Sequence, residues 1–157
     1  MSASTSASTT VRRLPAPRVA PSALTQLRSS RQGLAEAAEA TSAHVRYVCA
    51  HLAALRAAAA VLTTREPLDA RRRGRPRSVW VLLPDADPAL SEWAAFFAAS
   101  ADKRAAAEAG LPRAVTLREA DELLRDAEIF VSLVEETLGV PSQPTLPFTD
   151  YTGFKAS

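Results

Sequence analysis

The 157-residue chain has little of several residue types, and each shortage narrows the class of protein it can be. The single cysteine, Cys49, excludes an internal disulfide and is typical of a protein of the reducing cytoplasm. Aromatic residues make up only 6% of the sequence, and much of its hydrophobic content is alanine, which favours closely packed helices over sheets. No apolar run approaches the roughly 20 residues that span a bilayer, so no membrane contact is expected.

Acidic residues are missing from two stretches of the chain. None precedes Glu36, and none occurs in the segment 71–77, although the net charge of the whole chain is only +2. That segment carries five arginines in seven residues. Because such dense guanidinium groups repel one another, they are most stable against a polyanion, so we expect nucleic-acid binding, to DNA or RNA, by five residues: Arg71, Arg72, Arg73, Arg75 and Arg77.

The centre of this segment, Arg73-Gly74-Arg75-Pro76, is similar to an AT-hook, an extended peptide that lies in the minor groove of AT-rich DNA. Glycine lets the backbone approach the groove, proline holds an extended direction and arginine enters the electronegative groove. The alternative is a solvated loop, or arginines that pair with an acidic helix further along the chain.

Hydrophobic periodicity predicts an all-α fold. We expect a disordered arm over 1–20, an up-and-down four-helix bundle over 21–140 and a flexible tail over 141–157. A capping box at Thr116–Glu119 and a glycine C-cap at Gly139 delimit the last helix. The apolar run in 78–84 could be a strand or a short helix, and a helix is expected because a lone strand would leave its backbone groups unpaired.

The remaining helices are predicted from the residues that face the core. The second helix should pack through a heptad-like seam, with alanines on its other faces. The third helix, which starts near Pro88, should pack through an aromatic stripe. The expected seam residues are Val45, Val48, Leu52, Leu55, Ala59 and Leu62, and the expected inward residues of the third helix are Leu90, Trp93, Phe96, Phe97 and Ser100.

The four-helix layout, the alanine-rich helix 45–62 and the segment Arg75–Leu83 together resemble HEPN-domain proteins, in particular a small actinobacterial branch. The resemblance covers roughly residues 22–139 and implies a HEPN-like bundle. Many HEPN domains are metal-independent endoribonucleases that act as dimers through an R-x4-6-H motif, in which arginine binds phosphate and histidine does acid–base work.

Arg46 and His51 form the one R-x4-H spacing that this resemblance makes a catalytic candidate. Two features disfavour that role. The pair lies on the second helix rather than late in the fold, and its members lie about 140° apart around the helix, so they do not easily converge on one phosphate. The alternative is that His51 flanks the helical seam as a partly buried polar residue.

No metal or other cofactor is expected. His44 and Cys49 lie near His51, but no compact Cys/His cluster supplies the further ligand that a site needs. The paired carboxylates of the last helix, among them Glu135 and Glu136, alternate with arginines and are interpreted as a solvated face.

Near the C-terminus, Gln143, Leu146 and Phe148 resemble the Q-x-x-L-x-F peptide by which bacterial polymerases and repair proteins bind the β sliding clamp. A proline-stiffened segment loses little entropy on binding, and Leu146 and Phe148 would fill an apolar cleft. The alternative is that these side chains fold back onto the bundle.

Three hypotheses of function follow from the sequence. The first is a non-catalytic adaptor that contacts nucleic acid through 71–77 and recruits a partner through 143–148, with replication-coupled DNA repair as its natural setting. The second is a HEPN endoribonuclease that uses Arg46 and His51. The third is a protein-interaction bundle without a nucleic-acid role, dimeric through its alanine-rich face.

Overall fold

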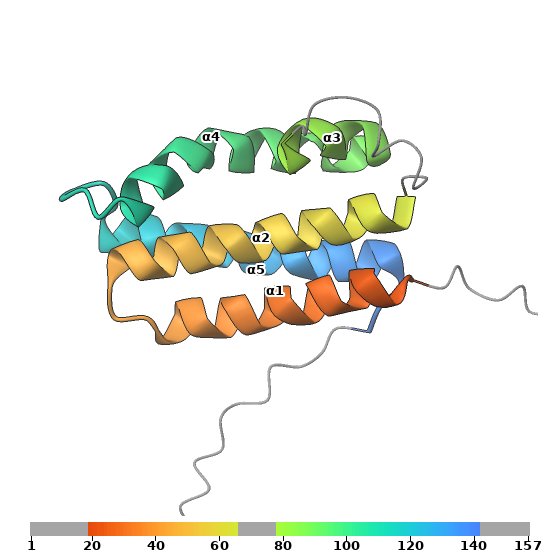
Figure 1. Ribbon diagram of the computed structural model, residues 1–157, viewed down its shortest axis with the longest axis horizontal. Helices are drawn as coiled ribbons and strands as arrows, with labels where there is room; N and C mark the ends of the chain where they lie inside the picture. Colours follow the sequence, from red (N-terminus) through yellow and green to blue (C-terminus); the bar gives the residue numbers. More distant parts are fainter. Residues whose placement is uncertain (1–18, 66–77, 142–157) are drawn as a thin grey trace, which may run out of the picture.

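The structure is a computed structural model that describes residues 19–65 and 78–141, and these residues form helices and no strand (Figure 1). The elements in chain order are α1 (Pro21–Glu39), α2 (Ala43–Arg65), α3 (Val79–Ala86), the 3-10 helix η2 (Pro88–Leu90), α4 (Ser91–Glu108) and α5 (Leu117–Leu138). The prediction of an all-α bundle is confirmed, as is the helix expected over 78–84. The predicted arm and tail lie almost entirely outside the described residues.

Helix α2 is the central element of the bundle. It lies between α1 and α4 in Figure 1, with α5 behind it, and it contacts α1, α3, α4 and α5. By length and composition α2 is the one described helix that could cross a membrane, contrary to the expectation that no segment is apolar enough. Its position explains the composition, because a helix surrounded by four others has apolar side chains on most of its faces.

The helix ends follow from local sequence. The Thr116 hydroxyl accepts a hydrogen bond from the Glu119 backbone N–H at 3.1 Å, and the Glu119 carboxylate accepts one in return from the Thr116 backbone. Gly139 ends α5 with a φ of 68°, in the left-handed region that favours glycine. Both predictions for this helix are confirmed. Ser78 starts α3 in a similar way, by accepting a hydrogen bond from the Trp80 N–H.

The predicted seam of α2 is wrong. Val45 is 51% exposed, and of the other expected seam residues only Leu62 is buried. The buried positions belong to the alanines that the sequence placed on the remaining faces, each of them 0% exposed: Ala50, Ala53, Ala54, Ala57, Ala58 and Ala60. Small side chains let neighbouring helices approach closely, so the alanine faces pack and larger residues lie at their edges. The alanine-rich face is therefore not available as the dimer surface of the third hypothesis.

An aromatic cluster fills the space between α3, α4 and α5. Phe97 is its centre, stacked on Trp80 at a ring distance of 5.1 Å and tilted against Phe130 at 5.2 Å. Trp93 completes the cluster from α4, as predicted. Phe96 packs edge to face on Phe97 at a ring distance of 5.0 Å, but it is 42% exposed at the edge of the cluster, so the expectation that it faces inward holds only in part.

Candidate functional site

Arg46, the proposed phosphate-binding residue, is bound to the end of α1. Its guanidinium donates to the carbonyl oxygens of Ala37 at 3.0 Å and Ala40 at 2.6 Å, and it also pairs with the Asp121 carboxylate of α5. The side chain thereby satisfies carbonyls that the last turn of a helix leaves unpaired. Arg46 fastens α1, α2 and α5 together at one end of the bundle.

His51, the proposed acid–base residue, lies in the core with 1% exposure. Its Nε2 is 3.1 Å from the Phe97 carbonyl oxygen, and because a carbonyl only accepts, Nε2 carries the proton. Trp80 and Phe97 both meet the imidazole ring edge to face. Nδ1 is buried and has no hydrogen-bond partner among the residues of the two described ranges.

The structure does not bring Arg46 and His51 together. The guanidinium contacts the end of α1 and Asp121, whereas the imidazole contacts the aromatic cluster between α3 and α4. This is the divergence that five residues of helix predict. In this arrangement the two side chains hold helices in place and share no cleft.

Burial lowers the pKa of His51, because the charged imidazolium loses its hydration in the core. The Phe97 carbonyl opposes this shift, and nearby Arg104 adds to it. The unfolded chain then binds a proton more readily than the folded chain. The stability conferred by neutral His51 is complete above the unfolded pKa, about 6.5, and is lost as the pH falls below it.

We therefore expect the free energy of unfolding to fall between about pH 7 and about pH 5, by up to roughly 1.4 kcal/mol per pH unit. Urea melts over this range measure the slope. His51→Gln keeps a donor for the Phe97 carbonyl and should abolish most of the slope, whereas His44→Gln should retain it. An unchanged slope in His51→Gln would assign the titration to another group.

The basic segment 71–77 and the tail residues Gln143, Leu146 and Phe148 lie outside the described residues, so their roles remain predictions from the sequence. The structure does describe the two helix ends that flank the basic segment. Arg65, the last residue of α2, pairs with Asp87 at 3.4 Å, which ties this end of α2 to the junction of α3 and η2.

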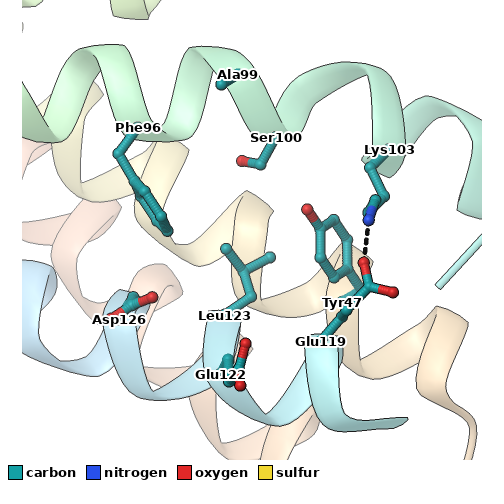
Figure 2. Close-up of a pocket in the computed structure, with 9 residues that line it drawn as sticks. All are labelled: Tyr47, Phe96, Ala99, Ser100, Lys103, Glu119, Glu122, Leu123 and Asp126. Carbon is teal, nitrogen blue, oxygen red and sulfur yellow. Dashed lines mark hydrogen bonds and ion pairs between the residues drawn. The ribbon is translucent and has the colours of Figure 1, made fainter. Parts of the chain in front are cut away.

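A groove of about 320 Å³ opens between α4 and α5 over the start of α2 (Figure 2). Phe96 reaches down from α4 toward α5, above Leu123 and Asp126, and Tyr47 rises from α2 on the floor. At one end Lys103 pairs with Glu119. The groove combines apolar walls with hydroxyl, ammonium and carboxylate groups: Tyr47, Phe96, Ala99, Ser100, Lys103, Glu119, Glu122, Leu123 and Asp126.

Burial dominates the electrostatics of two groups in this groove. It raises the pKa of the Tyr47 phenol, against the lowering effect of the neighbouring Ser100 hydroxyl and Lys103. It also raises the pKa of Asp126, and the Glu122 carboxylate adds to that rise while Arg125 opposes it. In Lys103 and Glu119 the charged forms are favoured instead, since their mutual hydrogen bond raises the pKa of the lysine and lowers that of the carboxyl. Asp126 is thus a carboxylate whose burial is only partly offset by the neighbouring Arg125.

Sequence reasoning missed the buried ion pair between α1 and α5. Glu135 is 1% exposed, and its Oε1 accepts a hydrogen bond from Arg31 Nε at 2.8 Å. The interpretation of Glu135 as part of a solvated face is wrong, although it holds for its neighbour Glu136, which is exposed. The partners are 104 residues apart in the chain, and no local signal joins them.

Fold and site together define an all-helical bundle in which the two residues with R-x4-H spacing are structural supports. The sequence profile of the SAV_6107-like HEPN family matches residues 37–135, more than half of the chain. The chain belongs to this family, and the resemblance drawn from its sequence is confirmed. Comparisons with curated proteins and with solved structures gave no match.

Proposed function

We propose that this chain is a non-catalytic HEPN domain that acts as a nucleic-acid-associated adaptor. The position of His51 supports the absence of catalysis in this proposal, because its side chain is 1% exposed and hydrogen-bonded to the Phe97 carbonyl in the core. A general acid or base must come within hydrogen-bond reach of the proton it moves, and a substrate does not reach this imidazole without opening the core. Arg46 is likewise engaged, by the end of α1 and by Asp121 of α5.

The segment 71–77 is the proposed nucleic-acid contact, to DNA or RNA. It joins the end of α2 to the start of α3, two points held in place by packing and by the Arg65–Asp87 pair. Its five arginines have no acid among them, whereas α5 carries several exposed carboxylates. A polyanion is therefore attracted to one region of the chain and repelled from another. The peptide 143–148 would then recruit a partner such as the β sliding clamp.

The test is binding of the purified chain to labelled duplex DNA and to labelled single-stranded RNA across a salt series. We expect Arg73→Gln, Arg75→Gln and Arg77→Gln combined to weaken binding at least tenfold at low salt. The slope of log K against log salt should become shallower by roughly 0.7 to 0.9 for each phosphate that the variant no longer neutralises. Fluorescence anisotropy measures both quantities, and the same tubes report whether RNA stays intact without metal.

A matched control removes three exposed helical arginines, by Arg28→Gln, Arg118→Gln and Arg125→Gln combined. It changes the net charge equally and should leave most of the binding in place. Equal losses in both variants would show that total charge, not the segment, attracts the nucleic acid. Cleavage of RNA that disappears in His51→Ala would establish the endoribonuclease instead, and no binding at all would leave the protein-interaction bundle.

A further inference from the structure

The outer surface of α4 and α5 carries apolar side chains that the bundle covers only in part. Phe96 is 42% exposed at the groove and Ile129 is 51% exposed on α5, and Leu133 lies half-buried beside it. Asp126, Ile129, Leu133 and Glu136 are spaced by three and four residues, so they share one face of the helix. This face is continuous with the groove through Asp126.

The same surface has carboxylates without cationic partners. Glu119 pairs with Lys103, and Glu122 pairs with Arg118 at 3.1 Å. Asp126, Glu128 and Glu136 form no ion pair with the residues described in the structure. The exposed Arg125 is the cation beside Asp126, and it balances only part of these three charges, so the apolar strip is bordered by net negative charge.

We propose that this α4–α5 surface binds a basic, amphipathic helical segment of a partner protein. A lysine or arginine of the partner would sit over the Phe96 ring and pair with Asp126, and apolar side chains one and two turns along would cover Ile129 and Leu133. From Asp126 to Glu136 the surface is ~15 Å long, which matches about ten residues of a partner helix. The recognition mode is that of an amphipathic helix laid on an apolar groove.

The negative charge of this surface favours a basic helix over nucleic acid or a second copy of the chain. The carboxylates repel a nucleic-acid backbone, so nucleic acid is not the expected occupant of this surface. A second copy docked by the same face would bring Asp126, Glu128 and Glu136 toward their own equivalents, and juxtaposed like charges are unfavourable. A cation also relieves the unfavourable burial of the Asp126 carboxylate, and the exposed Phe96 ring supplies a cation–π contact.

The probe is a synthetic helical peptide of about 18 residues with leucine on one face and arginine on the other. A second peptide has the same composition in a shuffled order without an apolar face. Both are titrated into the full chain at moderate salt and followed by anisotropy and by NMR. The amphipathic peptide should bind, should perturb the signals of Phe96, Asp126 and Ile129, and should lower the pKa of the Asp126 carboxyl.

Substitutions at the surface decide the proposal. Asp126→Asn should weaken binding about fivefold, as expected for a partly exposed ion pair. Phe96→Ala and Ile129→Ser should each weaken it about tenfold. The thermal melt of Ile129→Ser should be nearly unchanged because this side chain is 51% exposed, whereas Phe96→Ala should melt lower because the ring also packs on Phe97. Asp85→Asn, an exposed carboxylate on α3, is the matched control and should bind like the unmodified chain.

Three results would overturn the proposal. Equal binding of the shuffled peptide, or equal weakening by Asp85→Asn, would mean that net charge alone attracts arginine peptides. Binding that survives all three surface substitutions would place the contact elsewhere. Absence of binding by the unmodified chain would show that the surface does not recognise this class of partner.

Discussion

Replacing Arg31 with methionine is expected to lower the free energy of unfolding by about 3 kcal/mol, because it leaves a buried carboxylate without its partner. Glu135 is 1% exposed, whereas Arg31 keeps 18% of its side-chain surface in contact with solvent. Arg31 holds the carboxylate through Nε and Nη2 and donates to Ser132 Oγ at 3.2 Å. Methionine retains much of the apolar contact of the arginine stem and removes only the cation and its donors.

A double-mutant cycle separates this charge effect from packing. Adding Glu135→Leu to Arg31→Met removes both charges, and most of the lost stability should return, since paired apolar replacements of buried ion pairs are often neutral. Arg118→Met, at a pair whose side chains are 89% and 55% exposed, is the control and should cost less than about 1 kcal/mol. Urea melts of the unmodified chain, Arg31→Met, Glu135→Leu and the double variant complete the cycle, and Arg118→Met is measured beside them. A double variant as unstable as Arg31→Met alone would contradict the account.

The second large effect is expected at the contact of α1 and α2 around Gly33 and Ala53. Ala53 is 0% exposed, and a Cβ built on Gly33 of α1 would lie 3.4 Å from the Cβ of Ala53. Ser30 Oγ donates to the Ala53 carbonyl at 2.7 Å across the same interface. Ala53→Leu inserts three carbon atoms where no space exists, so it must push the helices apart. It should cost about 3 kcal/mol, the upper part of the range for overpacked cores.

Val45→Leu is the matched control on the same helix. Val45 belongs to the seam that periodicity predicted, yet it is 51% exposed, so the extra methylene meets solvent and stability should change by less than about 0.5 kcal/mol. Thermal melts and hydrogen exchange of α1 distinguish the two variants. If Val45→Leu were the more damaging substitution, the predicted seam would be the true interface and the packing described for α2 would be wrong.

The contrast between Ala53 and Val45 shows why the core of α2 could not be predicted. Apolar residues occur on every face of this helix, so periodicity selects a face only by assuming that larger residues are buried. In the bundle α2 is surrounded by four helices, and closeness of approach, not side-chain size, decides burial. The inward prediction for Phe96 held only in part, because its ring packs on the edge of Phe97 at the border of the groove and stays 42% exposed.

Features that depend on neighbouring residues were predicted well. The Thr116–Glu119 capping box and the Gly139 C-cap need only local backbone geometry, and both are present. The helix Val79–Ala86 followed from the argument that a lone strand leaves its backbone unpaired. The HEPN resemblance, which rests on the order of such elements, is confirmed over 37–135.

The sequence by itself therefore determined the helical class, the ends of the helices, the family and the segregation of charge along the chain. Only the tertiary structure decided which distant groups these side chains contact. His51 is buried against Phe97, the Arg46 guanidinium binds the end of α1 and Asp121, and Glu135 forms an ion pair with Arg31. The physical reason is the distance along the chain over which each kind of interaction acts. Caps and periodicity act over a few residues, whereas burial and ion pairing depend on which distant helices come into contact and how closely they pack.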